Sequence, residues 1–228
     1  IGCPDNIFPN WAVTYPDKSM QIFSMLGKNR RLEKSQNHID ILRKMYHLDQ
    51  DYSPYEKDNL FLEGTSSLVM DRLNKIAYMG ISARSHLEIA EIWSQKNDYT
   101  LIPFETKSHS GDAIYHSDVM MYIGTNLAVV CEDSITKGKN KVIESLYKTH
   151  ELMFIRQSQL LDFCGNCIEV KDDENHPCLI MSSKALSGYD DSQLKILNQF
   201  YDRIIHSDLA TIENHGGGSA RCMIMELY

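Results

Sequence analysis

The chain has 228 residues, of which 43% are hydrophobic and 24% charged, as in ordinary globular proteins. Its formal net charge is −8 and its one basic block is residues 137–141, which argues against nucleic acid or an anionic membrane as a partner. No apolar run approaches the ~20 residues of a membrane helix, and no signal-peptide pattern opens the sequence. The length allows one or two domains, and without a linker rich in Pro, Gly or Ser we expect one domain over residues 1–228. Because the chain starts at Ile1 in loop-like sequence, we also expect an original N-terminal segment to be missing.

The elements of the first half, in chain order, alternate between strands and helices. They are a strand at 20–25, a helix within 32–46, a hairpin of 68–72 and 76–80, a helix from Ser82 to about 95, and a strand at 99–104.

The second half of the sequence also alternates between strands and helices. We expect a hairpin of 120–124 and 127–131, a helix at 139–148, a strand at 152–155, a hairpin of 168–170 and 178–182, a helix at 191–204, and strands at 210–212 and 222–227. A strand–hairpin–helix–strand unit of ~50 residues thus recurs about three times, which favours a propeller-like ring over an open doubly wound sheet.

The cysteines are unevenly spaced, which favours free thiols in a reducing cytoplasm over a disulfide framework. They are Cys3, Cys131, Cys164, Cys167, Cys178 and Cys222. Cys164 and Cys167 form a CxxC pair without a second pair to complete a zinc site. We expect small core-filling side chains there, with redox or metal use as the alternative.

A run of three glycines, Gly216 to Gly218, precedes Cys222 near the end of the chain. Glycines in a row suit a backbone that passes very close to a neighbour or adopts positive φ, and they do not suit a packed strand. Arg221 beside Cys222 is expected to favour the nucleophilic thiolate. The alternative is a tight turn followed by a buried structural cysteine.

Other chemically suggestive residues lie in separate segments. Glu63 follows the apolar pair Phe61-Leu62, and His116 and Asp118 are two positions apart, hence on one side of an extended segment. Each has an ordinary explanation when taken alone: a solvated loop acid for Glu63, and a surface hydrogen-bonding pair for the other two. Arg84 near a helix start could be a surface charge.

Three ordered segments resemble the guanidine-modifying enzymes (amidinotransferase-like, or pentein), which include arginine deiminases, amidinotransferases and dimethylarginine hydrolases. They are Phe61-Leu62-Glu63-Gly64-Thr65 with the residues up to Arg72, Tyr115-His116-Ser117-Asp118-Val119, and Gly216-Gly217-Gly218-Ser219-Ala220-Arg221-Cys222-Met223. The resemblance implies an α/β propeller of repeated ββαβ modules around a central channel, here with an incomplete first module. Within the family the motifs look most like those of the bacterial citrulline ureidases.

The resemblance also implies the roles of the site residues. Cys222 would attack the planar carbon of a ureido or guanidino group, His116 would move protons, and Glu63 and Asp118 would hold the N–H groups of the head. Relatives often have Asn at the position of Asp118. The substrate-binding candidates are Arg84, which would hold an α-carboxylate, with Asn10, Asp5, Phe8, and Arg30 or Arg31. No metal or organic cofactor is implied.

The expected reaction converts citrulline and water to ornithine, carbon dioxide and ammonia. Arginine deimination, or another guanidino hydrolase or amidinotransferase activity, is the enzymatic alternative. A non-catalytic binding module of the same fold is an alternative of another class, against which the joint presence of Cys222, His116, Glu63 and Asp118 argues. The expected partner is a small amino acid, and the sequence leaves a homo-oligomer open.

Overall fold

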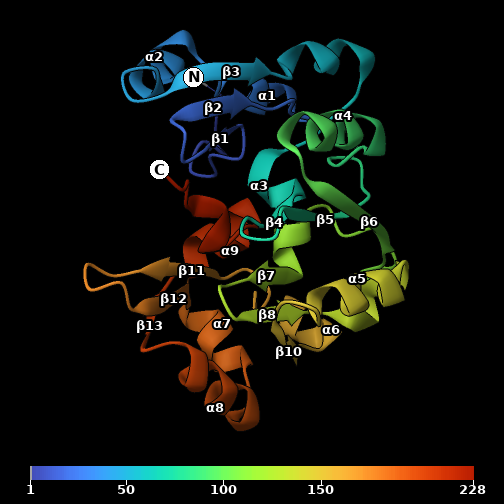
Figure 1. Cartoon of the computed structure of the whole chain (residues 1–228), viewed down its shortest axis with the longest axis vertical. Coiled ribbons are helices and arrows are strands. Elements are labelled where there is room, and N and C mark those ends of the chain that lie inside the picture. The colour runs from blue at the N-terminus through green and yellow to red at the C-terminus, as the bar shows by residue number, and fades with distance from the viewer. Residues whose placement is uncertain (1) are drawn as a thin grey trace.

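The strands of the protein form four small sheets, not one large sheet (Figure 1). The computed structural model describes residues 2–228. In each sheet the first two strands pair antiparallel and the third lies parallel to the second. The sheets are β1 (Ala12–Thr14), β2 (Ser19–Ile22) and β3 (His47–Asp51); β4 (Val69–Asp71), β5 (Ile76–Gly80) and β6 (Thr100–Thr106), extended by β9 (Ile135–Lys137); β7 (Met121–Ile123), β8 (Leu127–Val130) and β10 (Glu151–Phe154); and β11 (Ile168–Lys171), β12 (Pro177–Ser182) and β13 (Arg203–Ser207).

Helices connect the second and third strands of each sheet, because two parallel strands need a crossover connection. These are α1 (Lys28–Arg31) and α2 (Gln36–Leu42) in the first unit, α4 (Leu87–Asn97) in the second, α5 (Lys139–Leu146) in the third, and α7 (Ser183–Gly188) and α8 (Asp191–Phe200) in the fourth. The remaining helices are α3 (Gly64–Ser67), α6 (Gln157–Leu160) and α9 (Ala210–Gly216), with 3₁₀ turns at Ser53–Asp58, Ser117–Val119, Glu132–Ser134 and Arg221–Met223.

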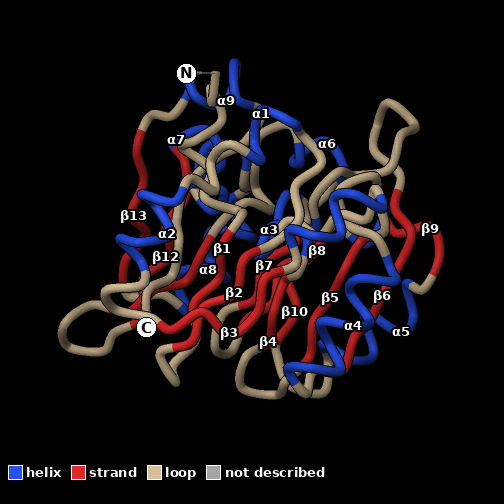
Figure 2. The backbone as a smooth tube through the Cα atoms, turned by 90° about the horizontal axis from the view of Figure 1, so that it is seen from above, coloured by secondary structure: helices blue, strands red, loops and turns tan. Residues whose placement is uncertain are grey.

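The mixed α/β class and the recurring ββαβ unit expected from the sequence are confirmed. The structure has four such units where the sequence indicated about three. The first unit, expected to be incomplete, has all three of its strands. Figure 2 shows the strands of all four sheets in red, with β13 at one side of the view and β6 and β9 at the other.

The C-terminal segment returns to the start of the chain after the fourth sheet (Figure 1). The Thr14 hydroxyl donates a hydrogen bond to the backbone carbonyl of Glu226 at 2.6 Å, and Arg72 forms an ion pair with the Glu226 carboxylate at 3.2 Å. This return brings the glycine run into the region of the N-terminal loop.

Four expected elements differ from the structure. The helix expected at 191–204 ends at Phe200, and Arg203–Ser207 form β13. The helix expected from Ser82 begins at Leu87. Residues 210–212 lie in α9 instead of a strand, because the Asp208 carboxylate accepts a hydrogen bond from the Ala210 amide and starts a helix there. Residues 222–227 form no strand, since the backbone turns at Arg221–Met223.

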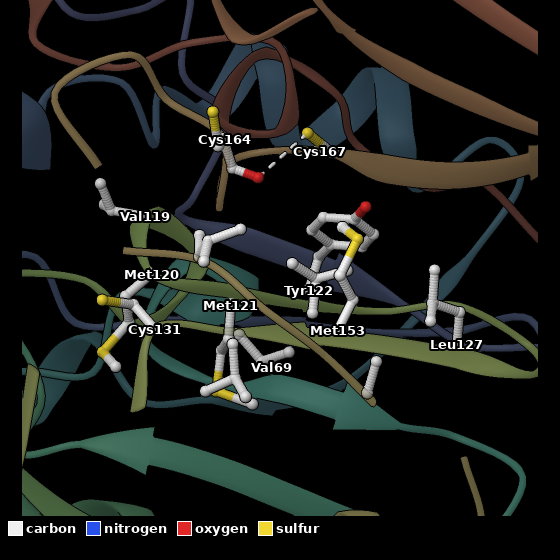
Figure 3. Close-up of a cluster of buried hydrophobic side chains, with 14 of the residues drawn as sticks. Val69, Val119, Met120, Met121, Tyr122, Leu127, Cys131, Met153, Cys164 and Cys167 are labelled. Carbon is white, nitrogen blue, oxygen red and sulfur yellow. Dashed lines mark hydrogen bonds between the residues drawn. The ribbon is translucent and has the colours of Figure 1, made fainter. Parts of the chain in front are cut away.

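The largest hydrophobic cluster is formed by buried side chains of the second, third and fourth sheets and of the helices packed on them, and Figure 3 shows part of it. It contains Cys131, Cys164 and Cys167, and all six cysteines are free thiols. Among residues 2–228 no helix is both long and apolar enough to cross a membrane, and no group of three or more metal-ligating side chains comes together.

Gly64 is the position where the fold tolerates a side chain least. Its φ is +52°, and a Cβ there would overlap the carbonyl oxygen of Asn10. We predict that Gly64→Ala lowers the free energy of unfolding by roughly 2 kcal/mol or more, because left-handed backbone alone costs an L-residue about 1–2 kcal/mol. Urea unfolding measures the change. Gly2→Ala is the control, since nothing lies within 4 Å of a Cβ there, and equal stability of the two variants would contradict the prediction.

Candidate active site

A cavity of about 330 Å³ lies between the N-terminal loop, the segment before the 3₁₀ turn at Ser117–Val119, and the glycine run. Its walls are formed by Asp5, Phe8, Asn10, Arg30, Arg84, Tyr115, His116, Gly216, Gly217, Gly218 and Cys222. The cavity thus brings together Cys222, His116 and five of the six residues expected to bind substrate. Arg31 is the exception, because its guanidinium faces the backbone carbonyls of Met25 and Leu26.

The glycine run lets the backbone approach the ring of Phe8. A Cβ on Gly216 or Gly218 would lie 2.8 or 2.9 Å from that ring, closer than packed atoms tolerate. Gly217 has φ +70° and ends α9 in the left-handed conformation that favours glycine. The chain then reaches Cys222 with only 6% of the residue exposed.

The Cys222 thiol lies between a carboxylate and an amide. Its Sγ is 3.5 Å from Oδ2 of Asp118 and accepts a hydrogen bond from Nδ2 of Asn166 at 3.1 Å. Burial, followed by the Asp118 charge, raises the pKa of Cys222. The expectation that Arg221 favours the thiolate is therefore wrong, because the Arg221 guanidinium turns away to the Ile224 carbonyl and the Glu226 carboxylate.

The His116 imidazole is held by the fully buried Glu63. Nε2 of His116 lies 2.8 Å from Oε2 of Glu63, and Arg84 and Arg30 place guanidinium nitrogens 3.4 and 3.7 Å from the same oxygen. Oε1 accepts the backbone N–H of Leu26 at 3.0 Å. Burial alone would raise the pKa of Glu63, but the hydrogen bond and charge of His116, with the charge of Arg84, lower it to about 2. No described residue hydrogen-bonds Nδ1 of His116, which leaves that nitrogen for a ligand.

Asp118 belongs to a different network from His116. The segment between them is not extended as expected: a 3₁₀ turn begins at Ser117, so the two side chains go to different partners. Oδ2 of Asp118 accepts hydrogen bonds from the Ser66 hydroxyl at 3.0 Å and from the Cys222 thiol. Oδ1 is buried without a hydrogen-bond partner among the described residues. Burial raises the pKa of Asp118.

The two cavity arginines differ in their surroundings. Arg30 is buried and bound to Glu33 at 3.0 Å. The Arg84 side chain keeps 36% exposure, and its guanidinium lies over the Tyr115 ring at 5.4 Å. Arg84 is therefore the more accessible cation for an anionic ligand group.

The remaining binding candidates are held by polar contacts of their own. Asn10 donates a hydrogen bond to the Ser66 hydroxyl at 2.7 Å, which extends the Asp118 network to the N-terminal loop. Asp5 accepts a hydrogen bond from Asn29 at 3.2 Å.

Sequence reasoning missed two residues of this site. Asn166 is fully buried and contacts both Cys222 and the backbone of Asp118. It lies between Cys164 and Cys167, and the CxxC spacing of these cysteines indicates only a role for the thiols, not for the asparagine between them. Tyr115 precedes His116, and its hydroxyl donates to the Gly217 carbonyl at 2.6 Å. Its place beside a motif histidine was the available signal.

The sequence of the chain matches one known protein family. Residues 2–228 match the family described as N,N dimethylarginine dimethylhydrolase, eukaryotic. A search of curated proteins gives no match.

Solved structures share the fold at low sequence identity. The N-terminal domain of ArgZ, an arginine dihydrolase of cyanobacteria, is 17% identical with a TM-score of 0.76, over 97% of this chain and 75% of that chain. Unliganded AgrE is 18% identical with a TM-score of 0.75, over 97% of this chain and 30% of that chain. A dimethylarginine dimethylaminohydrolase adduct is 16% identical with a TM-score of 0.71, over 99% and 78%. The mixed α/β fold of several small sheets is thus shared with solved structures of the guanidine-modifying enzymes.

The ion pairs of Glu63 predict a pH-dependent stability. Because its pKa is about 2 instead of the ordinary 4.5, the carboxylate stabilises the protein above pH 4.5 by roughly 3 kcal/mol, and this contribution is lost as the pH falls toward 2. We predict that Glu63→Gln is destabilised at pH 7 and that its difference from the native protein shrinks at pH 3. Denaturant unfolding at both pH values measures this, with the surface variant Glu105→Gln as control. A difference independent of pH would count against the assigned charge.

Proposed function

The chain belongs to the family of eukaryotic N,N-dimethylarginine dimethylhydrolases within the guanidine-modifying enzymes, and we propose that its activity is the hydrolysis of citrulline. Residues 1–228 would act as one catalytic unit, because the cavity draws on residues from Asp5 to Cys222. The observation that carries the proposal is a cysteine thiol in the same cavity as an imidazole oriented by a buried carboxylate.

The proposed reaction has two steps. Sγ of Cys222 gives up its proton to His116 and attacks the ureido carbon, the C–N bond to ornithine breaks, and His116 passes that proton to the leaving amine. Water then attacks the remaining S-linked carbamoyl group, with His116 accepting a proton, and releases carbamic acid, which decomposes to carbon dioxide and ammonia. The Glu63 carboxylate fixes the orientation of the imidazole through its contact with Nε2.

Asp118 offers the head a hydrogen-bond acceptor. It is not among the residues that line the cavity, but its Oδ2 lies 3.5 Å from the Cys222 sulfur. Its Oδ1 has no hydrogen-bond partner among the described residues, and we propose that it accepts a hydrogen bond from an N–H group of the head, which ureido and guanidino groups both carry.

One observation favours a second candidate, hydrolysis of arginine or its methylated forms. Burial and the Asp118 charge raise the pKa of Cys222, and a cationic guanidinium beside Sγ would favour the thiolate. ArgZ is described as an arginine dihydrolase, and AgrE has been crystallised with L-arginine.

Arg84 provides a binding group for the substrate's carboxylate. It lies in the cavity wall with about a third of its side chain exposed, and its guanidinium suits the α-carboxylate of a free amino acid.

The cysteines bear on the compartment. All six are free thiols, which supports a reducing compartment, and we propose the cytoplasm.

The test is product identification from a substrate panel. The purified protein is incubated with citrulline, arginine and dimethylarginine, and amine and amino-acid products are identified by mass spectrometry. We predict ornithine and ammonia from citrulline and none from Cys222→Ala, with Cys178→Ala, in β12 and outside the cavity wall, as the matched control that stays within several-fold of the native rate. Citrulline as the end product from arginine or dimethylarginine would assign the second candidate. Full activity in Cys222→Ala would exclude both.

The α-carboxylate contact gives a separate prediction. Arg84→Ala should lower kcat/KM for citrulline about 30-fold or more, because a charge-assisted hydrogen bond to substrate is lost. It should change the slower turnover of the decarboxylated analogue, 4-ureidobutylamine, only a few-fold. Arg43→Ala, which removes an exposed arginine at the end of α2, is the control. An equal loss of kcat/KM on both substrates would contradict the carboxylate contact and would indicate that Arg84 acts through its ion pair with Glu63.

A further inference from the structure

The Cys164–Cys167 segment contains a residue that the proposed reaction has not yet used. We propose that Asn166 is a positioning residue that stabilises the Cys222 thiolate and fixes Cys222 relative to Asp118. The inference deepens the proposed function and rests on Cys222 being its nucleophile.

The side chain of Asn166 bonds to two segments at once. Its Nδ2 donates one hydrogen bond to Sγ of Cys222 at 3.1 Å and one to the Asp118 carbonyl at 2.9 Å. Its Oδ1 accepts the backbone N–H of Cys222 at 3.4 Å. The amide therefore fixes both the sulfur and the backbone of the cysteine.

The amide chemistry suits this position. Asn166 has no exposed surface, and among the described side chains it supplies the only nitrogen in hydrogen-bonding distance of Sγ. The other side-chain partner of the sulfur is the carboxylate of Asp118, which disfavours a thiolate. An N–H donor favours the charged form of its acceptor, so Asn166 opposes the effects of burial and of Asp118.

The segment that carries Asn166 is pressed against the Asp118 segment. A Cβ on Gly165 would overlap the Val119 carbonyl and come within 2.8 Å of Met120 backbone atoms. The glycine therefore allows the direct backbone contact from which the Asn166 amide reaches the Asp118 carbonyl.

The two cysteines of the segment have structural contacts. Cys164 Sγ donates to the Ala185 carbonyl at 3.4 Å, and Cys167 Sγ donates to the Cys164 carbonyl at 3.6 Å (Figure 3). Burial raises the pKa of Cys167 to about 12. The Cys164 contact anchors the start of the loop to Ala185, and the Cys167 contact closes the loop on itself. The CxxC segment therefore holds the amide of Asn166 in place.

The test measures the Cys222 thiol directly, without substrate. The rate of iodoacetamide alkylation at Cys222 is followed against pH by mass spectrometry in the native protein, in Asn166→Ala and in the control Asn198→Ala. Asn198 is exposed and its amide donates to the Leu194 carbonyl. We expect Asn166→Ala to raise the apparent thiol pKa by about one pH unit, as loss of a hydrogen bond to a charged group predicts.

Steady-state kinetics provides the second readout. In Asn166→Ala, kcat on the substrate found in the panel should fall about 10- to 100-fold while KM changes less than about 3-fold, and Asn166→Ser, which keeps a donor, should recover part of both effects. An unchanged alkylation profile in Asn166→Ala would overturn the proposal. So would equal effects of the Ala and Ser substitutions.

A measurement on the native protein covers the case in which the variants do not fold. The side-chain amide protons of Asn166 should shift in NMR spectra with the same midpoint as Cys222 alkylation, and amide signals that do not respond to this titration would refute the contact. Because alkylation and NMR need no substrate, they decide on Asn166 even if the panel assigns a different reaction.

Discussion

The buried carboxylate of Glu63 is the interaction on which the rest of the site depends. A fully buried charge is costly unless it is paired and hydrogen-bonded, and removing one partner is strongly destabilising. Its partners come from three different units: Arg30 and the Leu26 amide from the first, Arg84 from the second, and His116 from the start of the third. The charge thus ties the sheets together and orients the imidazole by the same contacts.

A second constraint is steric, and it comes from glycines beside site residues. Gly64 follows Glu63 and passes the Asn10 carbonyl, Gly165 precedes Asn166, and Gly218 lets the backbone pass the Phe8 ring on the way to Cys222. At each place a side chain would separate two segments that must touch. The glycines therefore set the spacing between loops, whereas the polar side chains set the chemistry within it.

The sequence predicts the hairpins well because their apolar runs alternate with turn residues. The pairs β4–β5, β7–β8 and β11–β12 all fall close to their expected positions. It does not reveal β3, whose residues His47–Asp51 are largely exposed and polar and are extended because they pair with β2. The motifs also identify the four catalytic candidates together: Cys222, His116, Glu63 and Asp118.

The partners of these residues are not readable from the sequence. The contact of Asn166 with Cys222 joins positions 56 residues apart, and no local pattern encodes it. The same holds for Arg221, whose neighbourhood in sequence suggested a contact with the thiol that the fold replaces by Glu226.

The resulting site has two parts with different electrostatic character. Glu63, His116 and Arg84 form a charged part in which the carboxylate is ionised at neutral pH. Asp118 and Cys222 form the other part, where burial raises both pKa values and no side-chain cation of residues 2–228 hydrogen-bonds to either group. In the proposed reaction the charged part moves the proton and the other part supplies the nucleophile. A planar head that meets Asp118 and Cys222 must therefore either be neutral or bring its own positive charge, and this choice separates citrulline from arginine.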